Sequence, residues 1–144
     1  MRDFEDFIKQ GIVKIRSPNK SLANDLIQES ERKYNSLMNL INKIGISDEN
    51  ANDVIESSYD IFLYLIRAKL FIEGFKSSGE GAHEAEISYL TKIGFSENEI
   101  KVMDELRYFR NRIKYYGKRF GLEYAKKVLE FLDKNYNRIK GFIF

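Results

Sequence analysis

Apolar side chains recur every three or four positions through most of the sequence, which is the period of helices that bury one face. The segment 3–15 is the first example, and its apolar stripe consists of Phe4, Phe7, Ile8, Ile12 and Ile15. We expect a long helix after it, ending near Ile44, with Ser17 as N-cap and Pro18 in the first turn. No segment alternates between apolar and polar side chains with the period of a strand. The pattern therefore predicts an all-α protein.

Two nearly identical pentapeptides, KIGIS at 43–47 and KIGFS at 92–96, each follow an apolar periodic stretch. We interpret both as a helix end followed by a helix start. The glycine suits the left-handed position that ends a helix, and the serine suits the next N-cap. These residues are Gly45 with Ser47 and Gly94 with Ser96, and Ser96 also has the spacing of a capping box with Glu99.

The rest of the pattern predicts four further helices and one clear loop. The helices are 48–75, a short one ending near Ile93, 96–116 and 121–138, and the loop is KSSGEGA at 76–82. The middle of 48–75 is so apolar that one face cannot hold it, so this helix is expected to be central, buried on several sides or shared with a second subunit. We expect an antiparallel, up-and-down bundle of about five main helices plus a short N-terminal helix, assembled as a dimer.

Composition adds a few constraints. The chain has 144 residues, of which 43% are hydrophobic, so one core and a single domain covering 1–144 are expected. It has no cysteine, which excludes disulfides and favours a cytoplasmic setting. The longest strongly apolar run, 61–66, is too short to cross a bilayer, so no membrane association is expected. The carboxylates and the single histidine form no metal-ligand pattern, and no metal or other cofactor is expected.

Positive charge is concentrated in the segment RYFRNRIKYYGKRF at 107–120, which contains six basic and five aromatic residues and no acid. The net charge of the chain is only +2, so without these six cations the other residues carry −4. On a helix, Val102, Leu106, Phe109, Ile113 and Tyr116 would form an apolar stripe, and the opposite side would present Arg107, Arg110, Asn111, Lys114 and Lys118.

Cations beside aromatic rings suit phosphate pairing and base stacking, so RNA is the ligand that this chemistry fits best. The candidate RNA- or phosphate-binding residues are Arg107, Arg110, Lys114, Tyr116 and Lys118. The alternative is a solvated basic face near a helix C-terminus, where the helix dipole favours cations.

The order of long helices, with RNRIKYYG near the end of the penultimate one, resembles the HEPN superfamily from about Ser17 to Arg138. That family's signature is an arginine, a following polar residue and a histidine after four to six intervening positions, and Arg110 and Asn111 match its first two members. The resemblance implies a metal-independent endoribonuclease that acts as a homodimer, with the arginine and histidine of both subunits in an interfacial cleft. It also implies a toxin-like protein partnered by a minimal nucleotidyltransferase.

The signature histidine is missing. Four, five and six intervening positions after Arg110 lead to Tyr115, Tyr116 and Gly117. A tyrosine has a pKa of about 10 and donates rather than accepts a proton at neutral pH, which argues against cleavage. The candidate catalytic residues are therefore Arg110, Asn111 and Tyr115, with Tyr115 orienting a phosphate or stacking a base.

Two features stay open between a structural and a functional role. His83 is the only histidine, and we expect it to be structural or to cap a helix rather than to replace the missing catalytic group. The apolar end of the chain, 142–144, either packs back on the bundle or contacts another subunit.

Three functions fit these observations. The first is an RNA-directed HEPN-like protein, the second a non-catalytic module that binds a nucleotidyltransferase or another protein, and the third a dimeric helical scaffold.

Overall fold

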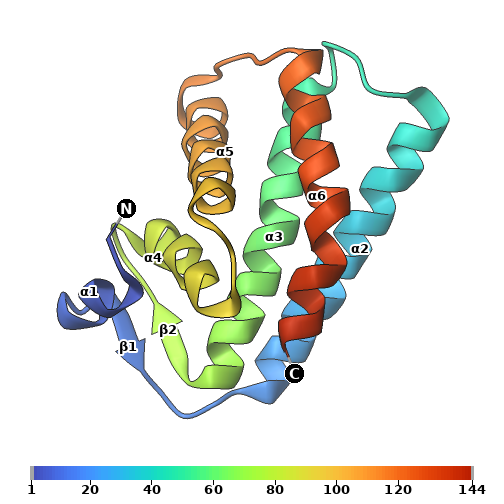
Figure 1. The fold of residues 1–144 in the computed structure, drawn as a ribbon. Coiled ribbons are helices and arrows are strands. Elements are labelled where there is room, and N and C mark those ends of the chain that lie inside the picture. The colour runs from blue at the N-terminus through green and yellow to red at the C-terminus, as the bar shows by residue number, and fades with distance from the viewer. Residues whose placement is uncertain (1, 144) are drawn as a thin grey trace.

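Six α-helices, a 3-10 helix and a two-stranded ribbon make up the part of the chain that the computed structural model describes, residues 2–143 (Figure 1). In chain order they are α1 (Phe4–Lys9), β1 (Val13–Ile15), α2 (Lys20–Ile44), α3 (Ala51–Glu73), β2 (Phe75–Ser77), α4 (Ala82–Ser88), η1 (Tyr89–Ile93), α5 (Glu97–Tyr116) and α6 (Leu122–Ile143). The predicted all-α character is confirmed, apart from the small ribbon.

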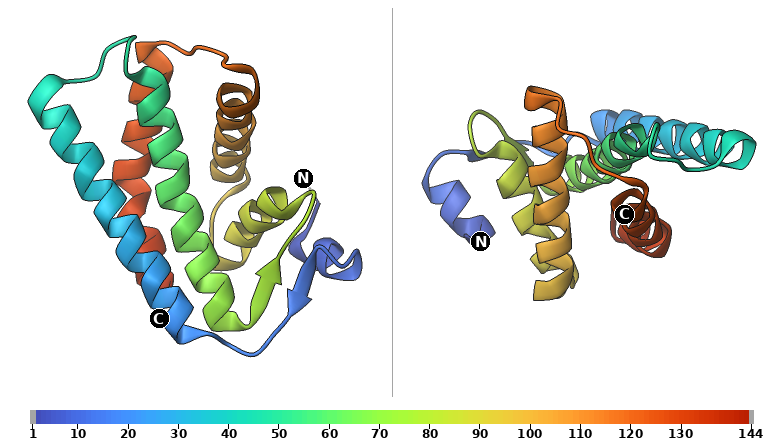
Figure 2. Two further views of the ribbon diagram at one scale, coloured as in Figure 1. Left: turned by 180° about the vertical axis from the view of Figure 1, so that it is seen from behind. Right: turned by 90° about the horizontal axis from the view of Figure 1, so that it is seen from above.

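Three long helices, α2, α3 and α6, lie side by side (Figures 1 and 2). The buried Ser30 of α2 donates a hydrogen bond to the Ile61 carbonyl of α3 at 2.8 Å. Tyr34 of α2 stacks on Tyr136 of α6 with ring centroids 4.1 Å apart. Because α6 begins beside the start of α3, these two neighbours run in the same direction, whereas α2 runs opposite to both. The α3–α6 pair is therefore parallel, although these two helices are not consecutive in the chain.

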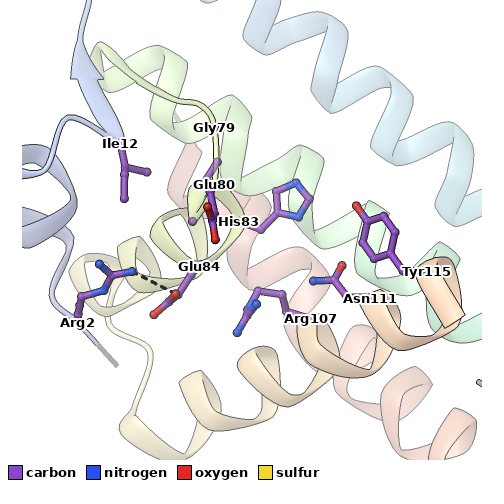
Figure 3. A pocket seen from close by; sticks show the side chains of 11 residues that line it. Arg2, Ile12, Gly79, Glu80, His83, Glu84, Arg107, Asn111 and Tyr115 are labelled. Carbon is purple, nitrogen blue, oxygen red and sulfur yellow. Dashed lines mark hydrogen bonds and ion pairs between the residues drawn. The ribbon is translucent and has the colours of Figure 1, made fainter.

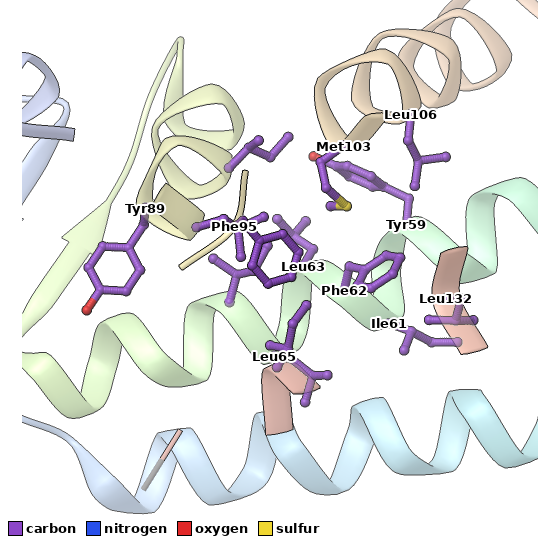
Figure 4. Packing of buried hydrophobic residues seen from close by; sticks show 14 of the residues in the cluster. Tyr59, Ile61, Phe62, Leu63, Leu65, Tyr89, Phe95, Met103, Leu106 and Leu132 are labelled. Carbon is purple, nitrogen blue, oxygen red and sulfur yellow. The ribbon is translucent and has the colours of Figure 1, made fainter. Parts of the chain in front are cut away.

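Helix α3 is the centre of the fold, as its composition predicted. It contacts α2 and α6 on one side and α4 and α5 on the other. Every residue from Ile61 to Ile66 except Tyr64 is buried. Figure 4 shows side chains of α3 meeting residues from α5, α6 and the segment around η1. Burial on several sides explains why its apolar residues are not confined to one stripe.

The N-terminal segment differs from the single helix expected over 3–15. Helix α1 ends at Lys9, and Gly11 then adopts a φ of 76°, which glycine tolerates and which turns the chain. Residues 13–15 pair antiparallel with 75–77, and Val13 faces Ser77 across the ribbon. Three residues are too few for a strand period to be visible in the sequence, and their partner lies about sixty positions away.

Helix α2 also begins later than predicted. The expected cap Ser17 and the following Pro18 lie outside regular secondary structure, and Asn19 is the N-cap, accepting a hydrogen bond from the Leu22 N–H at 3.0 Å. The Arg16 and Asn19 N–H groups instead donate to the carbonyls of Gly74 and Phe71, at 2.7 and 2.9 Å, and this holds the stretch 16–19 against the end of α3.

The two junctions behave differently. At the second, Ser96 is the N-cap of α5 and forms the predicted capping box with Glu99, and Gly94 is left-handed. At the first, Gly45 ends α2 with a positive φ, but Ser47 is not a cap. Asn50 precedes α3 instead, and its side chain bonds the Ser47 N–H and the Gly45 carbonyl, both at 2.9 Å. The side-chain bonds of Asn50 within the turn delay the start of α3.

Helix α6 continues past Arg138 into the apolar end of the chain. Ile143 is buried in the core at 1% exposure, whereas Phe142 is 43% exposed. Packing back on the bundle is thus confirmed for Ile143, and Phe144 lies outside the described residues. None of the helices between residues 2 and 143 has the length and apolar character needed to cross a membrane.

Candidate functional site

Helix α5 carries all the candidate catalytic residues, and its buried face is rotated from the predicted one. The buried side chains are Ile100, Met103, Leu106, Arg110 and Ile113. Leu106 and Ile113 were predicted to be buried, but Val102 and Tyr116 are 42% and 76% exposed. Helix α5 packs against α3 and α4, and Met103 and Arg110 lie on the side of α5 that faces these two helices.

Arg110 is therefore not on the exposed basic face where the sequence placed it. Its side chain packs toward α3, and its Nη2 donates to Asp60 Oδ1 at 3.1 Å. The guanidinium carbon lies 5.3 Å from the centre of the Tyr59 ring, a cation–π distance. Nε and Nη1 of Arg110 are buried without a hydrogen-bond partner among residues 2–143. A phosphate would have to compete with Asp60 for this arginine, and its catalytic role stays a prediction.

Four of the five other cations of the segment form a surface at the end of α5 and in the residues just after it, which we call the basic end of α5. They are Arg112, which is half-buried, and the exposed Lys114, Lys118 and Arg119. None of the ion pairs formed among residues 2–143 includes any of these four. Arg112 lies against Tyr108 and Tyr116, at 5.8 and 5.6 Å from the ring centres, and Lys114 lies 5.6 Å from the Tyr115 ring.

Arg107, Asn111 and Tyr115 lie four residues apart and share one side of α5, which faces α4. They line an open pocket of about 760 Å³, whose other wall is the 79–84 segment (Figure 3). Arg107 also forms an ion pair with Asp104 at 2.9 Å. The pocket thus brings together Asn111 and Tyr115, two of the three predicted catalytic residues, and leaves out Arg110.

His83, from the first turn of α4, lies in the same pocket opposite Asn111 and Tyr115 (Figure 3). Its position was not predictable from the sequence, because no spacing motif connects a residue of the 79–84 segment with α5. A functional role for His83, which the sequence did not favour, therefore has a structural basis in this pocket.

The protonation of His83 follows from its neighbours. Arg67 Nη2 lies 3.1 Å from His83 Nε2, and since a guanidinium can only donate, Nε2 must accept and the proton of the neutral ring lies on Nδ1. Arg67 is held by the buried Glu86 at 2.6 Å. Burial lowers the pKa of His83 to about 4, and the positive charges of Arg67, Arg110, Lys114 and Arg107 act in the same direction. His83 is therefore a neutral donor at pH 7.

This arrangement is suited to binding. A general base needs an imidazole nitrogen that is free to accept a proton, and Nε2 is occupied by Arg67. The pocket instead offers a ring N–H, an amide, a phenol and two guanidinium groups, from Arg107 and Arg2. Among residues 2–143, no group of three or more potential metal ligands is clustered.

Comparisons of the chain with protein-family models, with curated proteins and with solved structures give no match. The assignment of function consequently depends on the residues and the geometry described above.

Proposed function

We propose that the protein is a HEPN-like RNA-binding protein that holds the backbone of single-stranded RNA on the basic end of α5. The observation that carries the proposal is the group of four cations there that lack carboxylate partners among residues 2–143, in a chain whose net charge is only +2. Phosphates would supply the missing counter-charges.

The aromatic side chains beside these cations support a nucleic acid over a simple anion. Tyr115 and Tyr116 are 65% and 76% exposed, and exposed rings of this kind stack on unpaired bases. Arg112 already lies between two tyrosine rings, so its guanidinium is partly ordered before a ligand arrives. Lys114 and Lys118 are exposed and add charge to the same surface.

The proposal assigns binding rather than cleavage. Arg110 is engaged with Asp60 rather than free to bind a scissile phosphate. His83 has a lowered pKa and an occupied Nε2, so it is not placed as the general base that RNA cleavage requires. A metal-independent endoribonuclease is the less favoured form of the same hypothesis. Cleavage of RNA by the purified protein in the presence of a chelator, together with loss of this activity in the Arg110→Ala variant, would make the endoribonuclease the better assignment.

A homodimer and a toxin-like pairing with a nucleotidyltransferase belong to this proposal as consequences of the HEPN resemblance. A cytoplasmic setting belongs to it because the sequence has no cysteine. The second candidate function is a non-catalytic protein-interaction module or a dimeric scaffold. It is favoured by the exposed apolar surface of α5, where Val102, Tyr108 and Tyr116 are all more than 40% exposed. Sedimentation of the purified chain would establish whether it is a dimer.

The test of RNA binding is fluorescence anisotropy with a labelled single-stranded RNA over a range of salt concentrations. Affinity is expected to fall steeply with salt, and Lys114→Ala/Lys118→Ala should reduce the log–log slope by about 1.4, since each phosphate contact of a single strand contributes about 0.7. The matched control is Lys43→Ala/Lys126→Ala, which removes the same charge from exposed lysines of α2 and α6.

Equal losses in both double variants would show non-specific attraction and contradict a site on α5. Absence of RNA binding by a folded sample would leave the protein-interaction module as the better assignment.

A further inference from the structure

The pocket between α4 and α5 has features that the basic end of α5 lacks. It is concave, with a volume of about 760 Å³, and the exposed Tyr115 lines it. The ring of Tyr115 also contacts Lys114, which belongs to the basic end. An RNA strand held on the basic end would therefore pass beside the opening of this pocket, within reach of Asn111 and His83.

The charges of the lining are balanced. Arg2 and Arg107 are opposed by Glu80 and Glu84, and Arg2 approaches Glu84 to 3.4 Å. A site for bare phosphate would be expected to carry an excess of cations. A nucleotide requires a mixed lining, because its phosphate is anionic whereas its base presents both donors and acceptors.

His83 supplies a donor of fixed direction in this lining. The Arg67 contact at Nε2 determines the tautomer, and the ion pair of Arg67 with the buried Glu86 fixes the arginine in turn. None of the hydrogen bonds formed among residues 2–143 uses His83 Nδ1, so this N–H is free to bond a ligand. A neutral donor discriminates between base edges by requiring an acceptor opposite it.

We infer that this pocket binds one unpaired nucleotide of the RNA, with His83 Nδ1–H and the Asn111 amide bonding the base, Tyr115 stacking on it and Arg107 pairing with its phosphate. His83 is thus a specificity-determining residue and takes no part in proton transfer. The inference rests on the proposed RNA binding and adds the site at which the base is recognised.

The single histidine makes the test direct. Uniformly ¹⁵N-labelled protein contains one imidazole, so its ring resonances report on His83 alone. Titration with each of the four nucleoside 5′-monophosphates, and separately with inorganic phosphate at equal ionic strength, is expected to shift these resonances saturably with at least one nucleotide and not with phosphate. The largest change should be at the Nδ1 site.

Two substitutions at position 83 separate the two ring nitrogens. His83→Asn places an amide N–H near the position of Nδ1 and should retain most of the affinity for the nucleotide. His83→Gln extends its amide toward Arg67 and removes the pocket donor, so affinity should fall by about three- to tenfold, the effect of one hydrogen bond. Circular dichroism confirms that each variant is folded.

The outcomes distinguish this inference from the proposed function. If RNA binds with the expected salt dependence while the His83 resonances do not move, the nucleotide pocket is wrong and the basic face stands. Equal shifts with phosphate and nucleotides reduce the pocket to an anion site and also overturn the inference. If neither RNA nor nucleotides bind, both proposals fail. Should His83→Gln not fold, the titration of the wild-type resonances alone decides.

Discussion

Arg67 on α3 donates to Nε2 of His83 on α4 across 3.1 Å, and this contact determines which ring nitrogen of the only histidine carries the proton. The two residues are sixteen positions apart, and a buried glutamate, Glu86, holds the arginine in place. The imidazole that faces the pocket is consequently held as a neutral donor.

The pKa of His83 is expected to be about 4, because burial and the surrounding cations both disfavour the charged ring. Histidine side-chain NMR over pH 3–8 measures this value and reports the tautomer. Arg67→Met should raise the pKa, since it removes the nearest positive charge, whereas Lys69→Met on the same helix should leave it unchanged. A wild-type pKa at or above the ordinary 6.5 would contradict the geometry.

The same pKa predicts how stability depends on pH. The unfolded chain binds the imidazole proton with a pKa near 6.5 and the folded chain with about 4, so the free energy of unfolding should decrease as the pH falls between these values. His83 is only partly buried, and solvent screening limits the loss to about 1 kcal/mol.

Burial raises the pKa of Glu86, so the protonation of Glu86 increases the free energy of unfolding as the pH falls, opposite to the effect of His83. The wild type must therefore be compared with His83→Gln. Urea unfolding at pH 7 and pH 4.5 should show a smaller decrease in the variant. The same decrease in both proteins would exclude His83 as the cause.

The ion pair between Arg110 and Asp60 predicts an asymmetric response to mutation. Asp60→Asn leaves a largely buried guanidinium without its only carboxylate partner among residues 2–143, and should lower the free energy of unfolding by about 2 kcal/mol. Arg110→Met fills the same space and leaves an aspartate that water can reach, so it should cost about 1 kcal/mol or less. Urea denaturation measures both, and a greater loss in Arg110→Met would contradict this assignment.

Gly74 connects the end of α3 to β2, and its conformation permits no other residue without strain. It is left-handed, with φ of 83°, and a Cβ at this position would lie 2.6 Å from the Arg16 carbonyl oxygen. Gly74→Ala should therefore destabilise the fold by about 2 to 3 kcal/mol. Gly117→Ala is the matched control, because Gly117 is also left-handed but a Cβ there meets no atom within 4 Å. Thermal unfolding should show the larger decrease in Tm for Gly74→Ala.

The end of α6 contributes to the core through one of its two apolar side chains. Ile143→Ala should cost about 2 to 4 kcal/mol, the usual penalty for truncating a fully buried isoleucine. Phe142→Ala should cost less than about 1 kcal/mol, because Phe142 is 43% exposed. If Phe142→Ala instead dissociates a dimer, the exposed ring belongs to a subunit interface, and sedimentation of this variant would detect the change.

The sequence by itself determined the features that arise within a few consecutive residues. Ser96 and Glu99 form their capping box because both hydrogen bonds lie within one turn, and Gly94 is left-handed because the end of a helix requires it. The central position of α3 was also predictable, since only burial on several sides accommodates its apolar residues. The concentration of cations at the end of α5 could likewise be read from the sequence.

Only the tertiary structure decided which of those side chains meet. Whether Arg110 faces water or Asp60 depends on how α5 is rotated against α3, a matter of packing that the 3.6-residue period specifies only to within about one position. The ribbon of 13–15 with 75–77 and the placement of His83 beside Arg67 and the α5 pocket likewise join segments far apart in the chain. Such contacts are selected by the shape and polarity of the whole core, and no local spacing encodes them.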